Sequence, residues 1–385
     1  MKKEREHETG AGPAPAAERG AAEGGPGREA PEERLLRLLA ELSETPAPSG
    51  HEQKLARRVA AELEACADTV RTDALGNVIA RRSGSGTDTP PKLMIAAHMD
   101  EIGLIVTKVE DDGFLRFAPI GGIDPRTLAA QEVTVLTEPP LPGFIGVKPP
   151  HLLPEDERDK TVPIEDMFID TGLSPDEARR RVRPGDVAVI RRAFTRLLGT
   201  RAAGKALDNR AGVAAMLEAM NLLSGLRHAA DVYAVATVQE EVGLRGAMVS
   251  AYGIVPDAAI AVDVGFGAAP GLPEDDVIKM GRGPAIALGA NVHPQLHELL
   301  VETARLHGIP HQIEPMPAGS GTDAWAVQVV RSGVPTAVVS IPLRYMHSSV
   351  EVVDIEDVRN TARLLAHAAA ALREEDVKGW TYDLA

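Results

Sequence analysis

Acidic and histidine side chains stand at or just beyond the ends of several apolar runs in this chain of 385 residues. A polar residue at the end of one strand is usually a turn former or a helix cap. Four such ends in one chain favour a shared site, because open α/β sheets place their sites at the carboxyl ends of the strands. The residues are His98 and Asp100 after KLMIAA, Glu240 and Glu241 after VYAVATVQ, Asp263 after AAIAV, and His347 after PTAVVSIPL.

Asp208 lies in GKALDNRAG, a glycine-led segment that opens a predicted helix. From this pattern alone it fits an ordinary N-cap as well as a site residue. Together with the strand-end groups it completes a set that can hold two adjacent divalent metal ions. Such ions repel each other, so a carboxylate must bridge them and further carboxylates must lower the charge. Imidazole and carboxylate ligands without thiolate suit zinc, cobalt or manganese, and we expect zinc or cobalt.

The adjacent pair Glu240 and Glu241 would repel each other unless a positive charge lay beside them. One of the two can bind a metal ion while the other stays free. The free carboxylate can take a proton from metal-bound water, whose pKa a metal can lower to about 7. The pair therefore predicts metal-assisted attack of water on a substrate.

Other groups are weaker candidates. His293 and His297 stand four residues apart, but HELLVE is not the HExxH zinc pattern, and we expect a helix-surface role for them. The segment GSGT at 319–322 precedes a helix but lacks the lysine of a phosphate loop, so it favours a substrate carboxylate or a close backbone approach. No GxSxG segment is present, and the lone Cys66 lacks the electropositive setting of a reactive thiol.

The composition limits the class of protein. With 44% hydrophobic residues the chain can bury a large core, and we expect two domains. A net charge of -15 disfavours a nucleic-acid or anionic-membrane partner, because either would need a basic face. A single cysteine excludes an internal disulfide, and no apolar run approaches the roughly 18 residues of a membrane span. We therefore expect a soluble, cytoplasmic protein.

The pattern of apolar residues changes along the chain. Residues 1–30 contain no Ile, Leu, Val or aromatic residue, which predicts a disordered tail because burial cannot offset its ordering entropy. Helical spacing follows at 35–42 and 51–65, then a hairpin at 70–80 and a buried strand at 92–97.

A second change comes at residue 103. Short β-like runs separated by Gly, Pro and Asp continue to about residue 198 and predict a small inserted β-domain. Beyond residue 201 strands and helices alternate, which predicts an α/β sheet with helices on both faces. The expected helices are 209–223, 244–251, 294–306, 323–331 and 355–372, and the expected strands are 232–238, 258–262 and 336–341.

Several motifs occur in the order found in one peptidase family. They are AAHMDEIG, IGGIDPRTL, KPPHL, GKALDNRAG, VQEEVGLRGA, VDVG, GSGTDAWA and IPLRYMHS. The chain from about Pro31 to Arg373 resembles the glutamyl-aminopeptidase or TET family of dinuclear metallo-aminopeptidases, which also carries the legacy name cellulase or endoglucanase M. The resemblance implies an aminopeptidase that removes N-terminal residues from short peptides with two divalent metals per subunit.

The resemblance also implies a role for each matching residue. Asp208 bridges the metals, with His98 and Asp263 completing one site, and Glu241 and His347 completing the other. Two further positions match: Glu240 as general base and acid, and Asp100 as the carboxylate that orients the imidazole of a metal-bound histidine.

The fold implied by the resemblance is a mixed-sheet, three-layer α/β catalytic domain formed by residues 31–103 and 199–385. Residues 104–198 would form an inserted β-barrel that serves as lid and oligomerisation domain. Family members build hollow homo-oligomers, commonly dodecamers, so a homo-oligomer is expected here. Three alternatives stay open: a dinuclear hydrolase of acyl-amino acids, a metal-free glycosidase, and a metal-stabilised scaffold without turnover. An unpaired Glu240 argues against the scaffold, because a structural site gains nothing from a free carboxylate.

Overall fold

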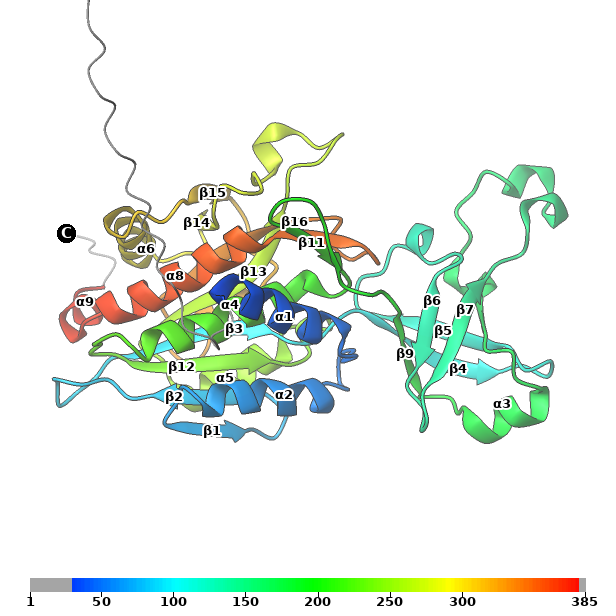
Figure 1. The fold of residues 1–385 in the computed structure, drawn as a ribbon, viewed down its shortest axis with the longest axis horizontal. Helices are drawn as coiled ribbons and strands as arrows, with labels where there is room; N and C mark the ends of the chain where they lie inside the picture. The colour runs from blue at the N-terminus through cyan, green and yellow to red at the C-terminus, as the bar shows by residue number, and fades with distance from the viewer. Residues whose placement is uncertain (1–29, 381–385) are drawn as a thin grey trace, which may run out of the picture.

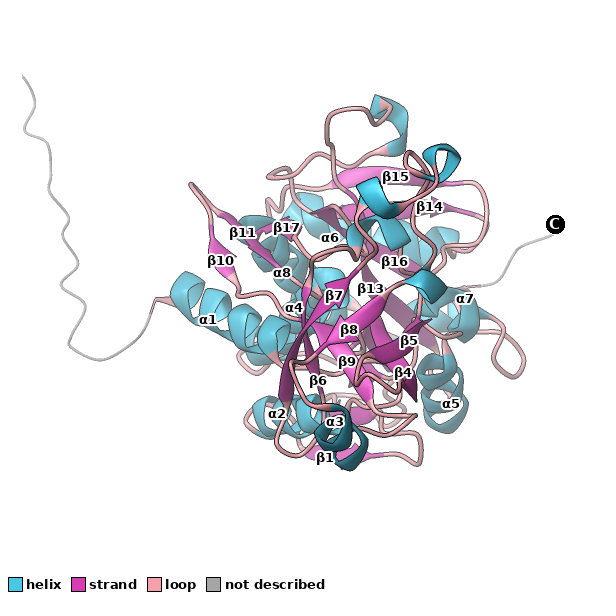
Figure 2. Ribbon diagram, turned by 90° about the vertical axis from the view of Figure 1, so that its right-hand side faces the viewer, coloured by secondary structure: helices cyan, strands magenta, loops and turns pink. Residues whose placement is uncertain are grey.

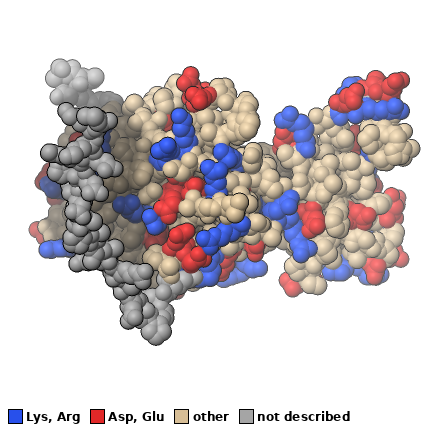
Figure 3. All heavy atoms as spheres, turned by 45° about the horizontal axis from the view of Figure 1, so that its top comes forward, with Lys and Arg blue, Asp and Glu red and all other residues tan. Residues whose placement is uncertain are grey.

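A computed structural model of the chain describes residues 30–380, which form an α/β body and a β-barrel beside it (Figure 1). The tail predicted for residues 1–30 lies outside the described residues except for Ala30. None of the helices within residues 30–380 has both the length and the apolar character that a membrane crossing requires. Basic and acidic side chains alternate over the face seen in Figure 3 instead of gathering by sign.

The body is built on a mixed sheet of eleven strands. Its central strands β12, β3, β13 and β16 are neighbours and run parallel, so their carboxyl ends share one edge. They are buried along most of their length, as parallel strands covered on both faces must be. In sheet order the strands are β1 (Thr69–Thr72), β2 (Val78–Arg82), β12 (Asp231–Thr237), β3 (Lys92–His98), β13 (Ala258–Phe266), β16 (Thr336–Arg344), β17 (Glu351–Asp354), β11 (Arg201–Gly204) and β10 (Thr195–Arg196), while β14 (Ala285–Gly289) pairs with β16 and β15 (Gln312–Met316) with β14.

Helices cover both faces of this sheet. Along β3 the side chains alternate between two cores: Leu93 and Ile95 face one, and Met94 and Ala96 face the other. The larger core includes helices α1 (Pro31–Glu44), α2 (Gln53–Glu64), α4 (Leu207–Leu223), α6 (Pro294–Leu306) and α8 (Ile355–Ala371), and the smaller core includes α5 (Arg245–Ile254) and α7 (Asp323–Gln328). The body therefore has three layers, as the fold class predicted.

The barrel is closed by six strands in the order β4-β5-β8-β7-β6-β9 and has its own apolar core. It lies at one end of the body in Figure 1 and in front of the sheet in Figure 2. Burial alternates along β7, as expected where one face lines a barrel interior. Its elements are β4 (Gly103–Val109), β5 (Leu115–Ile120), β6 (Glu132–Val135), β7 (Leu141–Gly146), β8 (Phe168–Asp170), α3 (Pro175–Arg181) and β9 (Val187–Ile190).

The α/β class and the barrel were predicted, but several details differ. Strand β13 runs on to Phe266, so Asp263 lies inside the strand and not beyond its end. Helix α7 ends at Gln328, before the predicted residue 331. Strands β8, β10, β11, β14, β15 and β17 and helices α3 and α9 (Glu374–Gly379) were not predicted. The run QIEPM of β15 alternates between partly and fully exposed residues and contains a proline, so it carries little strand signal.

Candidate active site

The parallel strands bring the predicted residues to one edge of the sheet. Thr237, which precedes Glu240 and Glu241, pairs with His98 across β12 and β3, and Asp263 lies on the next strand, β13. Six of the seven predicted residues line one cavity of about 610 Å³, and the seventh, Asp100, is fully buried. The six are His98, Asp208, Glu240, Glu241, Asp263 and His347.

Asp208 stands between two groups of ligand-type side chains. Its Oδ1 lies 3.2 Å from His98 Nε2, and its Oδ2 lies 3.3 Å from His347 Nε2. On the first side Asp263 Oδ1 is 3.7 Å from His98 Nε2, and on the second Glu241 Oε1 is 3.2 Å from His347 Nε2. The two halves therefore share one carboxylate, in the arrangement that a pair of metal ions needs.

These separations suit metal ligands. Nitrogen and oxygen ligands about 2.0 to 2.1 Å from a tetrahedral ion lie about 3.3 Å from one another. Ligand atoms of His98, Asp208 and Glu241 all fall within 4.8 Å of one another. The donors are imidazole and carboxylate only, so the set fits divalent ions of the zinc, cobalt and manganese type.

Asp100 holds several parts of the site in place. Its backbone oxygen lies 3.2 Å from His98 Nδ1, closer than its carboxylate Oδ1 at 3.5 Å. The carboxylate accepts hydrogen bonds from the backbone N–H groups of Glu240 (3.0 Å) and Glu241 (3.2 Å) and from the Ser49 hydroxyl (2.6 Å). Asp100 therefore orients the imidazole chiefly through its backbone and uses its carboxylate to fix the glutamate pair.

Glu351 has a matching role that the sequence did not indicate. This buried residue of β17 accepts hydrogen bonds from the backbone N–H of Asp208 at 3.0 Å and of His347 at 2.9 Å. Burial and the nearby Asp208 charge raise its pKa well above the ordinary value. Glu351 thus ties together two residues that are far apart in sequence and adjacent in the site.

A buried ion pair lies beside the site. Lys205 Nζ donates to both carboxylate oxygens of Glu101, at 2.8 and 2.6 Å, and Arg210 Nη2 lies 3.5 Å from Glu101 Oε1. All three side chains are buried. All three lie within the motifs AAHMDEIG and GKALDNRAG, but their interaction was not predicted because Glu101 meets the two cations only in the folded chain.

The cluster concentrates negative charge in a buried place. Burial, together with the charges of Asp263 and Asp323, raises the pKa of Glu240 to about 10. Burial lowers the pKa of His98, but the carboxylates around it outweigh this effect and raise it well above its usual value. Hydrogen bonds to Asp208 and Glu241 raise the pKa of His347 to about 11. Divalent cations would relieve the same repulsion that protons relieve here, which favours a metal site.

The cavity extends away from the cluster along β13 and β15. Two segments form part of its wall, through Phe266 on one and Met316, Ser320, Gly321 and Thr322 on the other. Glu314 and Trp325 also line it and were not predicted. The GSGT segment thus belongs to this cavity, whereas the expectation for His293 is wrong: this side chain is buried, with its ring 5.7 Å from that of Trp380.

A loop of the barrel reaches the cluster. A Cβ atom added at Gly122 would lie 3.1 Å from His347 Nδ1, and one at Gly121 would lie 3.3 Å from the Glu241 side chain. Gly121 has a φ of +76°, a conformation that favours glycine. The barrel therefore contributes a wall that leaves no room for larger residues.

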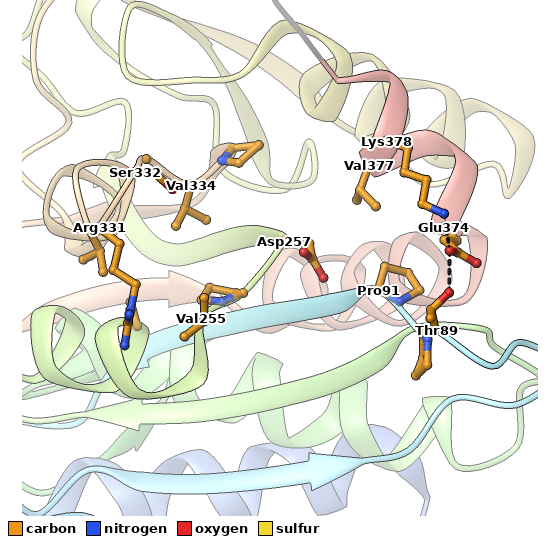
Figure 4. Close-up of a pocket in the computed structure, with 16 residues that line it drawn as sticks. Thr89, Pro91, Val255, Asp257, Arg331, Ser332, Val334, Glu374, Val377 and Lys378 are labelled. Atoms are coloured by element: carbon orange, nitrogen blue, oxygen red, sulfur yellow. Dashed lines mark hydrogen bonds and ion pairs between the residues drawn. The ribbon is translucent and has the colours of Figure 1, made fainter.

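A second cavity of about 460 Å³ lies at the opposite ends of the same strands (Figure 4). Its charged groups already have partners within the chain. Glu374 accepts hydrogen bonds from Thr89 and Lys378, and Arg331 lies over the ring of Tyr252 and donates to its backbone oxygen at 2.8 Å. Nothing in this cavity gathers ligand-type side chains, so the chemistry belongs to the other edge.

The three-layer fold gathers metal-ligand side chains at one edge of its sheet, and comparisons with known proteins give the class. Residues 76–364 match the family described as M42 glutamyl aminopeptidase. The chain is 43% identical over 343 residues to a lysyl aminopeptidase from Pyrococcus furiosus, covering 88% of this chain and 96% of that protein. This chain belongs to the M42 glutamyl aminopeptidase family.

Solved structures agree with this assignment. An aminopeptidase from the archaeon Desulfurococcus kamchatkensis matches with a TM-score of 0.85 at 40% identity, covering 91% of this chain and 98% of that one. A Pyrococcus horikoshii TET1 peptidase, which can assemble into a tetrahedron or a large octahedral shell, matches with a TM-score of 0.78 at 35% identity, covering 88% and 100%. The chain is thus a peptide-bond hydrolase of the aminopeptidase type, and its family implies divalent metal cofactors.

Proposed function

We propose that the buried cluster is the catalytic centre of this aminopeptidase. Asp208 would bridge two metal ions, with His98 and Asp263 completing one site, and Glu241 and His347 completing the other. One observation carries the assignment: the two oxygens of Asp208 face the two histidines at 3.2 and 3.3 Å. We propose zinc or cobalt as the ions, because both accept mixed imidazole and carboxylate ligands.

The bound metals would supply Lewis acidity and lower the pKa of water. Glu240 does the proton chemistry in this proposal. It takes a proton from the attacking water and gives it to the departing amine. Its Oε2 lies 4.0 Å from His98 Nε2, and its backbone N–H is fixed by Asp100, so the carboxylate stays beside the cluster and remains free of the ligand set. A positive charge next to Glu240 would lower its pKa and favour the form that accepts a proton.

The preference for a free amino terminus follows from the metals that the cluster would hold. A free, uncharged amine could bind at one metal and the first peptide carbonyl at the other, which would set the carbonyl beside Glu240. A peptide with an acetylated amine cannot bind in this way and should lose its positioning. We therefore propose exopeptidase action on short peptides.

Further proposals concern the rest of the chain. Residues 31–103 and 199–385 would act as the catalytic domain, and residues 104–198 as a lid and oligomerisation domain. The closeness of Gly122 to His347, where an added Cβ would lie 3.1 Å from Nδ1, supports a role for the barrel at the site. The TET1 assembly supports a homo-oligomer, with a dodecamer as the form to test first. We also propose a cytoplasmic location, which suits an enzyme that hydrolyses short peptides.

The test is release of amino acids from free and acetylated short peptides by the purified protein. Each assay is run with a chelator, and again after zinc or cobalt is restored. We expect activity that requires metal and a free amine, with the N-terminal residue identified as the product by mass spectrometry. Release from acetylated peptides at an equal rate would instead indicate an acyl-amino-acid hydrolase.

A further inference from the structure

The cavity holds one carboxylate that the proposed mechanism does not use. Glu314, on β15, is half-buried and lines the same cavity as the cluster. Its Oε2 accepts a hydrogen bond from the Ser340 hydroxyl at 2.6 Å, which fixes the carboxylate in place. Taking a carboxylate out of water is unfavourable unless it has a partner, so we expect a partner for Glu314 in this cavity.

Strand register places Glu314 close to the cluster. Ser340, its hydrogen-bond donor, pairs directly with Asp263 across β16 and β13. The other carboxylate oxygen of Glu314, Oε1, would lie 3.4 Å from a Cβ atom added at Gly265. Gly265 stands two residues beyond Asp263 on the same face of β13, a step of roughly 6.6 Å. This is about the reach of one long side chain that starts at the cluster.

The space between Glu314 and the cluster is open and is lined by apolar side chains. A side chain at Gly265 would meet Ile278 Cδ1 at 2.4 Å and would narrow the approach to Glu314. Met316, Phe266 and Trp325 line the cavity around it, and the two aromatic residues are more than half exposed. Such surfaces suit the alkyl stem of a lysine or arginine whose charged end lies deeper.

No basic residue of the described chain balances this carboxylate. Burial raises the pKa of Glu314, the Ser340 hydrogen bond opposes the rise, and no cation within residues 30–380 contributes to it. The negative charge of Glu314 is therefore available to a cationic group of a substrate that enters the cavity. A substrate ammonium or guanidinium group would provide the missing partner.

We propose that Glu314 forms the floor of the subsite for the N-terminal residue and selects peptides that begin with lysine or arginine. The inference rests on the proposed function, since it requires that the substrate amine lie at the cluster. Ser340 is then a positioning residue that aims the carboxylate. A glutamate that stays protonated would instead accept uncharged side chains, and the experiment separates the two cases.

Binding tests the proposal without turnover. L-lysine and L-norleucine differ only in the terminal ammonium group, and each is titrated calorimetrically into the metal-loaded protein. We expect lysine to bind about 30-fold more tightly or better, the size of effect seen for a buried charge pair. In Glu314→Gln the two ligands should bind alike. Equal binding in the unmodified protein would overturn the proposal.

Turnover gives a second, independent readout. The values of kcat/KM are compared for lysyl, arginyl, leucyl and glutamyl anilides. Glu314→Gln should lower the lysyl and arginyl values about 30-fold or more and leave the leucyl value within about 3-fold. Glu314→Lys should raise the glutamyl value. Glu302→Gln, on the exposed side of α6, is the matched control and should change nothing.

The outcomes distinguish this inference from the proposed function. Leucyl turnover without a preference for basic residues, or an equal loss for all substrates in Glu314→Gln, would refute the role of Glu314 alone. Preferential lysine binding with no turnover of any substrate would support the subsite and refute the proposed activity. If Glu314→Gln does not fold, Ser340→Ala keeps the charge but loosens it, and should reduce the lysyl-to-leucyl ratio.

Discussion

Asp208 can present both carboxylate oxygens to the cluster because its neighbour Asn209 caps helix α4. The Asn209 Oδ1 accepts a hydrogen bond from the backbone N–H of Gly212 at 3.0 Å, and its Nδ2 donates to the Val262 oxygen at 2.8 Å. The φ and ψ angles of Asp208 and Asn209 are not helical, so the regular part of α4 begins after them. The N-cap role that the sequence allowed for Asp208 is therefore taken by the next residue.

Replacing Asn209 by alanine should destabilise the fold. The change removes a cap and leaves the buried Val262 oxygen without its donor, at a cost of about 2–4 kcal/mol. Urea unfolding in the presence of a chelator measures this without a metal contribution. Asn221→Ala, at an exposed position of the same helix, is the control and should change stability by less than about 0.5 kcal/mol. Equal effects of the two changes would contradict the capping role.

Replacing Glu240 by glutamine should abolish proton transfer but spare the metal ligands. We expect kcat to fall by about 100- to 10,000-fold, the usual contribution of a general base. Metal content, measured by mass spectrometry after desalting, should stay unchanged. The matched variant Glu241→Gln should lose metal as well as activity. Metal loss in Glu240→Gln would instead make this residue a ligand.

The buried pair of Lys205 and Glu101 offers a test of stability. Lys205→Met leaves the Glu101 charge buried with Arg210 as its remaining cation, and should cost about 3–5 kcal/mol. The double variant Lys205→Met with Glu101→Gln should be more stable than the sum of the single changes predicts, and a double-mutant cycle measures the difference. The exposed pair Arg196–Glu33 is the control: Arg196→Met should cost less than about 1 kcal/mol. Additive losses at Lys205 and Glu101 would contradict a direct interaction.

Removing the metals should make stability more dependent on pH. Burial raises the pKa of Glu240 to about 10, and hydrogen bonds to Asp208 and Glu241 raise that of His347 to about 11. A folded state with raised pKa values binds more protons than the unfolded chain, so this stabilisation is present at low pH and is lost as pH rises. Asp208 has a lowered pKa and is ionised in both the folded and unfolded chain above pH 7, so its contribution to the free energy of unfolding is constant there.

The melting temperature of chelator-treated protein should therefore fall between pH 7 and pH 10. That of the metal-loaded protein should fall less, since the metal charge replaces the protons. Thermal unfolding scans at several pH values measure both slopes. Parallel slopes with and without chelator would show that the cluster does not bind cations.

The cluster was predictable because all of its residues except Asp208 follow or end an apolar run. Neighbouring parallel strands end at one edge, so four local patterns were enough to place His98, Glu240, Glu241, Asp263 and His347 together. The fold class followed from the same alternation of strands and helices. The roles of the individual residues came from family resemblance and stay predictions until they are tested.

The supporting residues carried no such local signal. Glu351 contacts Asp208 across 143 positions, and Lys205 contacts Glu101 across 104. Such pairs depend on how distant segments pack, which the spacing of residue types does not record. Glu314 was missed for a related reason: its strand is short and partly exposed, so QIEPM gave no indication that one of its side chains faces a substrate cavity.

The position of the barrel in the chain has a consequence for biosynthesis. Strand β3 precedes the barrel, but both of its neighbours in the sheet, β12 and β13, follow it. On the ribosome, β3 and His98 therefore emerge long before the strands that flank β3, and His347 emerges after all of these strands. A nascent chain has no complete cluster until then. The order of these residues along the chain thus means that the cluster cannot assemble before β16 and His347 have been made.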